Sequence, residues 1–365
     1  MERIDVVVVG GGVSGLAAAL ALAERGQTTC VVERHPRPGL ETSTHNSGVI
    51  HAGIYYPTGS LKAALCVEGR ERLYAFCRTH AVPHVQCGKL IVAGHPGEIG
   101  ELDRLRALGS ANGATGLEIV DRAFIARREP HIRADTALFS PDTGIVDPDA
   151  LVGALRRAGE AAGVMFLPGT RMVGADALAD GMAIHTERES IAATTVVNAA
   201  GLYADDVSRM LGGERFTIYP SRGEYAELAP ARRSLVNALV YPVPHSAGHG
   251  LGVHLTRTTG GHVWLGPTAA YQERKDDYED NRIPLEQFLE PARALLPELT
   301  IDDLRLSGSG IRPKLNAPSE PFADFLIRRD RINPAIIHAA GIESPGLTSC
   351  LAVGRLVSEL ARDAA

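Results

Sequence analysis

The stretch from Asp5 to Glu33 constrains the fold of this chain more than any other, because it has the full pattern of a β-α-β unit. The continuous apolar run from Val6 to Val9 is typical of a parallel strand that is buried on both faces. Gly10, Gly12 and Gly15 follow at the spacing G-x-G-x-x-G. These glycines allow a tight turn, a close approach of a pyrophosphate and close packing of the next helix. The first turn is therefore predicted to be a dinucleotide phosphate site.

The second half of the unit supports the same interpretation. A helix is predicted from Val13 to Arg25, ending at Gly26, with the unpaired N–H groups of its first turn directed at the phosphates. A strand from Thr28 to Val32 then leads to Glu33, whose carboxylate can accept hydrogen bonds from both hydroxyls of an adenosine ribose. Strand, turn, helix, strand and acid arrive in the required order, although this unit alone leaves NAD and FAD both open.

Length and composition limit the number of domains, the kind of partner and the cellular setting that this chain can have. A chain of 365 residues can bury a large core and is expected to form two domains. The net charge of −6, with both signs interspersed, argues against nucleic acid as the main partner. Five scattered cysteines without C-x-x-C spacing indicate a reduced, cytoplasmic setting. The first strand begins by residue 4, which leaves no room for a signal peptide, and no transmembrane span is expected, although peripheral membrane contact stays open.

A second stretch with many candidate functional side chains is HNSGVIHAGIYY, from His45 to Tyr56. We expect Asn46 and Ser47 to cap a short helix through Val49 and Ile50, which makes N–H groups near Ser47 and Gly48 available to a ligand. His51 would lie one turn into this helix. A packed core histidine is the alternative interpretation of His51.

The rest of the chain alternates between helical and extended patterns. The strand-rich region from Phe216 to Val263, with a hairpin turn at Thr259, predicts an antiparallel substrate-domain sheet. Near the end, Ser344 is expected to cap a long helix with Pro345 at its first position. Further predicted segments are a helix from Leu61 to His80, a helix from Pro148 to Ala162, a β-meander from Arg171 to Ile191, a strand from Ala193 to Val197 that leads to a glycine turn at Gly201, and a strand from Ala335 to Ala339.

Together these patterns predict an α/β fold, α+β overall, in which two domains interleave along the chain. A Rossmann-like dinucleotide domain, with a central parallel sheet and a small β-meander, is assigned to residues 1–85, 142–214 and 314–365. A substrate-binding domain with an antiparallel β-sheet is assigned to residues 86–141 and 215–313.

Several motifs carry a resemblance to a known family, and they extend from residue 5 to about residue 352. They are HNSGVIHAGIYY with SLKA and CGKLIVA, then VVNAAGLYAD, LVYPVP with LGVHLT, GIRPK and ESPGLTS. The chain resembles FAD-dependent oxidoreductases of the D-amino-acid oxidase superfamily, and is most similar to the L-2-hydroxyglutarate dehydrogenases and oxidases. This resemblance implies FAD as the cofactor, and no metal is expected.

The resemblance also implies where FAD would bind. The glycine unit would hold the ADP moiety, the stretch after His45 would line the flavin, and N–H groups at the start of the last helix would stabilise the negative charge of the reduced flavin. The predicted cofactor-binding residues are Gly10, Gly12, Val13, Ser14, Gly15, Glu33, Arg34, Ser43, Asn46, Ser47, Gly48, Gly201, Gly341, Ser344, Pro345, Gly346, Leu347 and Thr348.

The implied reaction is the oxidation of a small-molecule 2-hydroxy acid, L-2-hydroxyglutarate to 2-oxoglutarate, by hydride transfer to flavin N5. His51 is the first candidate for the base that takes the hydroxyl proton, and His254 is the second. Arg312 matches an arginine that binds the substrate carboxylate in related enzymes. The weaker candidates for a second carboxylate or the hydroxyl are Tyr56, Arg222 and Lys314.

Alternatives remain open at this point. A glycerol-3-phosphate dehydrogenase or an amino-acid oxidase of the same superfamily would use the same cofactor. A non-catalytic FAD-binding protein would retain the flavin motifs without turnover, and an NAD-dependent dehydrogenase would lack flavin altogether. Oxygen, a quinone or another carrier could each reoxidise the flavin.

Overall fold

Strand β1 (Arg3–Val9) lies at the centre of the first large sheet in the computed structural model, which describes residues 3–244 and 253–362. It pairs in parallel with β2 (Thr29–Val32) on one side and with β12 (Ser190–Asn198) on the other. These pairs confirm the predicted central parallel sheet, and the predicted β-meander forms its edge. The other strands of this sheet are β9 (Met165–Leu167), β10 (Met172–Leu178), β11 (Gly181–Thr186), β19 (Leu326–Arg329) and β20 (Ile336–Ala340).

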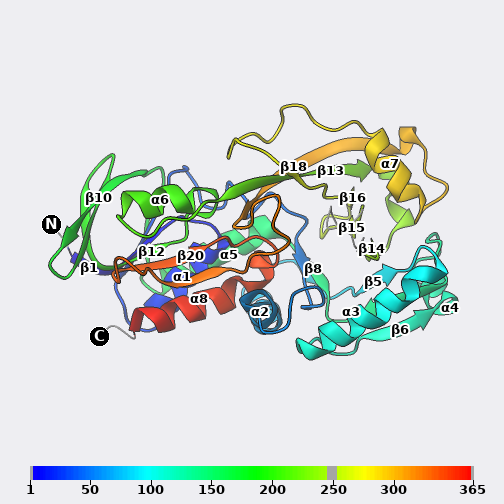
Figure 1. Cartoon of the computed structure of the whole chain (residues 1–365), viewed down its shortest axis with the longest axis horizontal. Helices are drawn as coiled ribbons and strands as arrows, with labels where there is room; N and C mark the ends of the chain where they lie inside the picture. Colours follow the sequence, from blue (N-terminus) through cyan, green and yellow to red (C-terminus); the bar gives the residue numbers. More distant parts are fainter. Residues whose placement is uncertain (1–2, 245–252, 363–365) are drawn as a thin grey trace.

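Alternate side chains of β1 enter different layers of the core. Val6 and Val8 pack against helices α1 and α8, whereas Val7 and Val9 pack against the meander and helix α6. Helix α5 packs against α1, and helix α2 packs against α8 (Figure 1). A Cβ at Gly354 would clash with the carbonyl group of Ala17, so glycine lets α8 lie close against α1. The bounds of these helices are α1 (Val13–Ala23), α2 (Leu61–Thr79), α5 (Pro148–Ala161), α6 (Ala204–Met210) and α8 (Gly346–Arg362).

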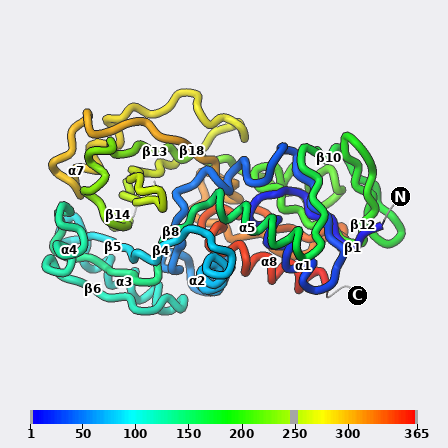
Figure 2. Tube along the Cα trace, turned by 180° about the vertical axis from the view of Figure 1, so that it is seen from behind, coloured from blue at the N-terminus to red at the C-terminus, as the bar shows by residue number. Residues whose placement is uncertain are grey.

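The second large sheet lies at the other end of the molecule, away from the two chain termini, in both views (Figures 1 and 2). Its strands pair antiparallel, as predicted, except that β14 and β5 are parallel. Helix α7 packs on its core. The elements of this part are β5 (Lys89–Val92), α3 (Ile99–Ala111), β6 (Glu118–Asp121), α4 (Arg122–Arg128), β7 (Thr136–Ser140), β13 (Tyr219–Leu228), β14 (Leu239–Pro242), β15 (Leu255–Arg257), β16 (Val263–Leu265), β17 (Ala270–Tyr271), α7 (Glu286–Arg293) and β18 (Leu304–Lys314).

A small three-stranded sheet corrects one prediction about the stretch after His45. Val49 and Ile50 form strand β3 and not a helix, because they pair with Ile145 and Gly144 of β8. Asn46 does not cap a helix; its Oδ1 accepts a hydrogen bond from the backbone N–H of Gly48. His51 therefore follows a strand. The strands of this sheet are β3 (Val49–Ile50), β4 (His84–Val85) and β8 (Gly144–Val146), and the 3-10 turns of the chain are η1 (Pro96–Glu98), η2 (Gly201–Tyr203), η3 (Pro230–Leu235) and η4 (Ile301–Asp303).

The division into two interleaved domains stays a proposal, and sheet membership supports it. Strands of the first sheet come from residues 3–32, 165–198 and 326–340, whereas strands of the second come from residues 89–140 and 219–314. Leu251 and Gly252 of the LGVHLT motif lie outside the described residues. Among the helices of the described chain, none has the length and apolar character that crossing a membrane requires.

Candidate active site

A cavity of about 630 Å³ opens at the carboxyl ends of β1, β2 and β12. Ligands of open α/β sheets bind at such strand ends. The predicted cofactor-binding residues in its lining are Gly10, Gly12, Val13, Ser14, Glu33, Arg34, Ser43, Asn46, Ser47, Gly201, Ser344, Pro345, Gly346 and Leu347. His51, His254 and Arg312 line the same cavity. The first turn of the chain, the start of the last helix and strands of the second sheet therefore meet at one site.

The carboxylate of Glu33 is held at the dinucleotide end of the cavity by backbone groups. Its two oxygens accept hydrogen bonds from the N–H of Gly11, at 2.6 Å, and from the N–H of His35, at 2.8 Å. An ionised carboxylate has about four acceptor positions, so it can still accept bonds from a ribose. The guanidinium group of Arg34 lies 3.7 Å from the ring centre of Tyr203, which places a flat surface beside this end.

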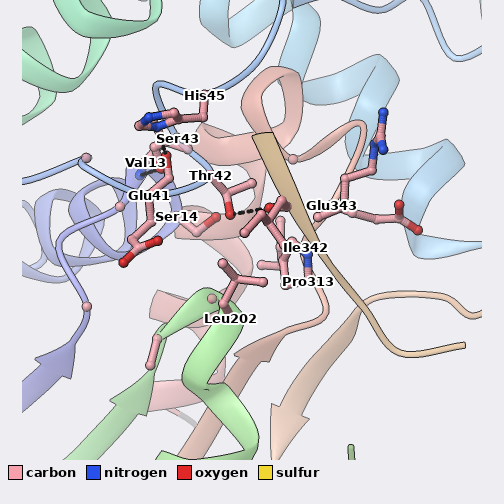
Figure 3. Close-up of a pocket in the computed structure, with 18 of the residues that line it drawn as sticks. Val13, Ser14, Glu41, Thr42, Ser43, His45, Leu202, Pro313, Ile342 and Glu343 are labelled. Carbon is pink, nitrogen blue, oxygen red and sulfur yellow. Dashed lines mark hydrogen bonds between the residues drawn. The ribbon is translucent and has the colours of Figure 1, made fainter. Parts of the chain in front are cut away.

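The loop before β3 is tied to elements on both sides of the cavity (Figure 3). The Oγ of Ser43 accepts a hydrogen bond of 3.0 Å from the N–H of Val13 at the start of α1. The hydroxyl of Thr42 donates a hydrogen bond of 2.8 Å to the carbonyl oxygen of Ile311 on β18. This loop therefore links the dinucleotide turn to the strand that carries Arg312.

Glu41 lines the cavity and was not among the predicted site residues. Its carboxylate accepts a hydrogen bond of 2.6 Å from the Tyr278 hydroxyl and contacts His35 and Arg34. Burial opposes ionisation, but the bonds from Tyr278, His35 and Arg34 outweigh it and lower the pKa of Glu41. Glu41 was missed because its partner Tyr278 lies 237 positions away in the chain.

The start of α8 contacts the segment that carries His51. Helix α8 begins at Gly346, one residue after the predicted first helical position Pro345. The Oγ1 of Thr348 accepts a hydrogen bond of 3.0 Å from the N–H of His51 and donates one to the carbonyl oxygen of Val49. His51 is therefore fixed relative to the helix end that faces the cavity.

The imidazole of His51 is neutral in this setting. Burial lowers the pKa of His51 to about 3, and the positive charge of Lys89 adds to this effect. Its Nε2 lies 3.3 Å from the Oγ of Ser344, which is itself 3.2 Å from the hydroxyl of Tyr56. Its buried Nδ1 has no hydrogen-bond partner among the described residues. A buried nitrogen without a partner is a costly arrangement.

His254 contributes its ring to the cavity wall. Its ring stacks on the ring of Tyr241, with the ring centres 3.5 Å apart and the planes at 11°. Both residues line the cavity, as does Tyr225. The two tyrosines were not predicted as site residues, because a tyrosine in a strand is usually a packing residue.

Arg312 directs its guanidinium group across the neighbouring strand β13. Its two terminal nitrogens donate hydrogen bonds of 3.2 and 3.3 Å to the carbonyl oxygen of Thr268. A Cβ at Gly223 would lie 2.7 Å from both nitrogens, so only a glycine leaves room for the guanidinium there. The remaining N–H groups give Arg312 the capacity to bind a carboxylate.

Glu343 also lines the cavity (Figure 3), and two lysines hold it. Its carboxylate lies 2.9 Å from the Nζ of Lys62 and 3.1 Å from that of Lys314. Burial opposes ionisation of Glu343, but Lys62 and Lys314 outweigh it and hold its pKa below the usual value. Glu343 was missed because a lone acid before a helix reads as a surface residue.

Some predicted residues are not in the cavity lining. Arg222 instead forms ion pairs with Glu224, at 3.0 Å, and Asp277, at 3.4 Å, inside the second sheet. Lys314 is engaged with Glu343, and Tyr56 with Ser344. Gly15, Gly48, Gly341 and Thr348 are also absent from the lining.

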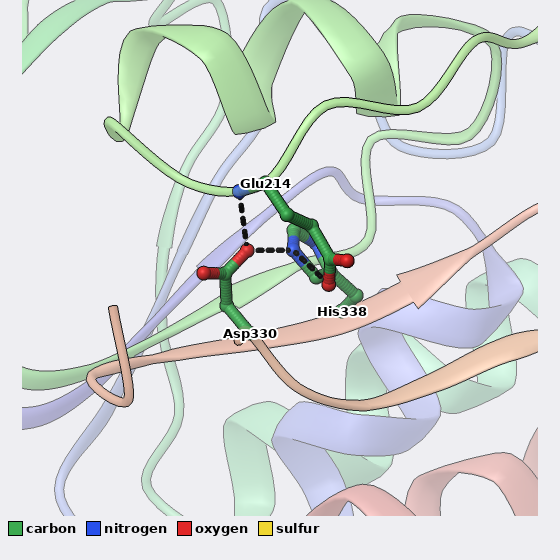
Figure 4. Close-up of side chains that lie close together, drawn as sticks. All are labelled: Glu214, Asp330 and His338. Carbon is green, nitrogen blue, oxygen red and sulfur yellow. Dashed lines mark hydrogen bonds and ion pairs between the residues drawn. The ribbon is translucent and has the colours of Figure 1, made fainter. Parts of the chain in front are cut away.

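One group of side chains in the described chain has the composition of a metal site, namely Glu214, Asp330 and His338 (Figure 4). Asp330 already accepts hydrogen bonds from His338 and from the N–H groups of Glu214, Ile332 and Asn333, at 2.7–2.8 Å. Arg328 pairs with Glu214 at 2.6 Å. These bonds account for the cluster as a structural link between β20 and the loop after α6.

Comparison with known proteins agrees with this geometry. A family model described as FAD dependent oxidoreductase matches residues 5–360. A mitochondrial L-2-hydroxyglutarate dehydrogenase of Arabidopsis thaliana is 36% identical over 403 aligned positions, which cover 98% of this chain and 83% of that protein. An L-2-hydroxyglutarate dehydrogenase of Escherichia coli is 32% identical over 390 positions, which cover 96% and 91%.

Solved structures share the whole architecture. An L-alpha-glycerophosphate oxidase from Mycoplasma pneumoniae, dithionite-reduced and with FAD bound, is similar at a TM-score of 0.90 and 27% identity, covering 99% of this chain and 95% of that one. A glycine oxidase from Geobacillus kaustophilus is similar at a TM-score of 0.84 and 22% identity, covering 100% and 95%. The second likeness is one of fold alone.

Proposed function

The chain belongs to the family of FAD dependent oxidoreductases, and on that basis we propose that it oxidises L-2-hydroxyglutarate to 2-oxoglutarate. The reaction removes a hydride from Cα and a proton from the hydroxyl group of a CH–OH donor. The cofactor is FAD, in agreement with the resemblance of the sequence motifs.

The residues of the cavity fit FAD. Gly12 has no side chain to cap α1, and Ser43 accepts a hydrogen bond from the N–H of Val13, so the N–H groups that follow in the first turn are left for a phosphate. Glu33 is proposed to bind the ribose, and Ser43, Ser47 and Gly346 line the same cavity. Bound FAD supplies the two-electron acceptor for the hydride.

The chain's own residues would bind and orient the substrate. Arg312 is proposed to hold the carboxylate next to the reacting carbon through its planar N–H groups. His51 is proposed to take the hydroxyl proton, since its imidazole lines the cavity and is neutral. His254 remains the second candidate for the base, since it lines the same cavity.

The observation that carries this proposal is the meeting of His51, Arg312 and the dinucleotide turn in one cavity. The proposed base and the proposed carboxylate-binding cation line the same cavity as the dinucleotide turn, which supports the proposal. Identity of 32–36% to L-2-hydroxyglutarate dehydrogenases over nearly the whole chain supports this substrate over others.

Glycerol 3-phosphate is a second candidate substrate. The glycerophosphate oxidase likeness extends over 99% of the chain at 27% identity, and Arg312 could hold a phosphate as well as a carboxylate. Amino-acid oxidation and a non-catalytic flavoprotein are further alternatives. We keep a cytoplasmic location, and reoxidation by oxygen, a quinone or another carrier, as parts of the proposal.

An anaerobic substrate screen tests these alternatives. Purified holoenzyme is mixed with L-2-hydroxyglutarate, D-2-hydroxyglutarate, glycerol 3-phosphate or an amino acid, and the flavin absorption band is followed. We expect bleaching by L-2-hydroxyglutarate alone, and bleaching only by glycerol 3-phosphate would overturn the proposal. Admission of air afterwards tests oxygen as the acceptor.

A further inference from the structure

Lys89 is buried beneath the wall of the cavity. It lies on β5 within the CGKLIVA motif, and 1% of its surface is exposed. Its Nζ is 4.6 Å from the ring centre of Tyr55 and 4.8 Å from that of Tyr241, so the two rings enclose the ammonium group. Lysine is almost never fully buried unless its charge is paired, so this position requires an explanation.

Lys89 has no carboxylate partner among the described residues. The groups that face it are Tyr241 from β14, His51 and Tyr55 from the segment after β3, and Cys66 from α2. Among the described residues, the ionisable group that acts on Lys89 is the Cys66 thiol, and no carboxylate does. Burial raises the pKa of Cys66 to about 12 and the pKa values of both tyrosines above the ordinary range, so all three stay protonated at neutral pH.

One layer of side chains separates Lys89 from the cavity. Tyr241 and His51 both line the cavity, and His254 stacks on Tyr241 there. The charge of Lys89 reaches this layer, because it contributes to the low pKa of His51. An anion held beside His51 and Tyr241 would therefore feel the same charge through little water.

We propose that Lys89 is the buried counter-charge for a dianionic substrate, and that it takes up a proton when a dicarboxylate binds in front of Tyr241. Lys89 acts through the wall and not by contact, so it is a positioning residue that favours substrates with two carboxylates. This inference rests on the proposed function, because it deepens the choice of a 2-hydroxy dicarboxylate over a monocarboxylate.

The direction of the pH effect follows from the charges. Burial lowers the pKa of Lys89 to about 7, opposed in part by Cys66, so near neutral pH a large fraction of the free protein lacks this charge. A bound dianion favours the ammonium form and raises the pKa. Affinity for the dianion is therefore full below about pH 7 and falls as the pH rises toward the higher pKa of the complex.

The test measures binding without turnover. The holoenzyme is titrated with 2-oxoglutarate, the product, at pH 6.5, 8 and 9, and Kd is taken from the change in flavin absorption. Isothermal calorimetry in buffers of different ionisation enthalpy counts the protons taken up. The monocarboxylate 2-oxopentanoate, which has the same carbon chain, is the matched ligand. Lys89→Met removes the charge, and Lys89→Arg keeps it at every pH.

We expect the Kd of the wild type for 2-oxoglutarate to rise about tenfold between pH 6.5 and 9, which corresponds to a pKa shift of about one unit. Lys89→Arg should bind tightly at every pH, and Lys89→Met should bind weakly and without pH dependence. If the Lys89→Met variant keeps the wild-type pH dependence of Kd, the proposal is overturned. The pH dependence would then belong to His254 or another group.

If Lys89→Met fails to fold, measurements on the wild type alone still test whether Lys89 takes up a proton. Absence of proton uptake with 2-oxoglutarate near pH 7.5, or equal uptake with 2-oxopentanoate, would overturn the role of Lys89. Failure of the proposed function is seen separately, as a flavin that L-2-hydroxyglutarate does not bleach.

Discussion

The Oγ of Ser344 lies 3.3 Å from the Nε2 of His51, across 293 positions of sequence. This contact occupies one ring nitrogen and leaves Nδ1 as the buried atom without a partner among the described residues. Ser344 precedes α8, so the helix that faces the cavity also orients the candidate base. The predictions below test this arrangement and the groups around it.

Replacement of His51 by Asn should abolish most substrate-driven flavin reduction while FAD stays bound. Loss of a general base costs about 100-fold or more in rate. Stopped-flow absorbance under anaerobic conditions measures the rate, and the exposed His95 gives the control variant His95→Asn. Unchanged reduction in His51→Asn would move the role of the base to His254.

The low pKa of His51 predicts the shape of the pH profile. Burial, with the charge of Lys89, lowers this pKa to about 3, so the neutral base is present above about pH 4 and is lost only as the pH falls below that range. The ratio of the limiting reduction rate to Kd, which reports the free enzyme, should show no acid limb between pH 5 and 7. An acid limb centred near pH 6.5 would contradict a desolvated His51.

Arg312→Lys should weaken substrate binding more than it slows the bound reaction. The lysine keeps a positive charge but loses the planar pair of N–H donors, a loss of about 2 kcal/mol, or roughly 30-fold in Kd. The dependence of the flavin reduction rate on substrate concentration separates binding from rate. Arg305→Lys, exposed on the same strand, is the control. Equal Kd values in both variants would remove Arg312 from the carboxylate site.

Glu33→Ala should weaken FAD retention by about tenfold or more, since it leaves the N–H groups of Gly11 and His35 without their acceptor and removes the ribose contact. Equilibrium dialysis of the flavin measures this change. Glu24→Ala, at the exposed end of α1, serves as the control. Full occupancy in dilute Glu33→Ala protein would show that the ribose contact contributes little.

Asp330→Asn should destabilise the fold by about 2 kcal/mol at pH 7, because a buried carboxylate with four hydrogen-bond donors loses its charge. Burial raises the pKa of Asp330, but the N–H groups of Asn333 and Glu214 and the bond from His338 outweigh this and lower it. The stabilisation is therefore present above the unfolded pKa near 4 and is lost as the pH falls through the lower folded value.

Urea unfolding of Asp330→Asn at several pH values measures this effect. The difference from the wild type should be constant between pH 5 and 7 and shrink below about pH 4. Asp135→Asn, whose side chain is exposed, is the control. A difference that grows on acidification would show that the carboxylate is not the stabilising form.

Local signals were sufficient to predict the dinucleotide half of the site. The pattern from Val6 to Glu33 lies within one β-α-β unit, and the structure has its strands, helix and glycine turn almost at the predicted bounds. Helix α5 likewise begins where Asp147 caps it, as its N-terminal residues predict. In such elements neighbouring residues decide the backbone conformation.

The features that the sequence did not predict depend on contacts between residues far apart in the chain. Val49 and Ile50 form a strand because β8, almost one hundred residues later, supplies its partner. The assignment of Arg222 to the substrate does not follow from the structure, since Glu224 and Asp277 hold its guanidinium group. Spacing in the chain contains no information on such partners.

The packing of α8 on α1 has a consequence for when the protein can bind its cofactor during synthesis. The glycine turn leaves the ribosome at the start of translation, whereas Gly346 and the helix behind it emerge more than three hundred residues later. Domains tend to fold as they emerge, yet the cavity lacks the wall formed by Ser344 to Leu347 until α8 docks against Ala17 through Gly354. Cofactor loading must therefore follow release of this last helix, and a ribosome-stalled chain that ends before it should not retain flavin.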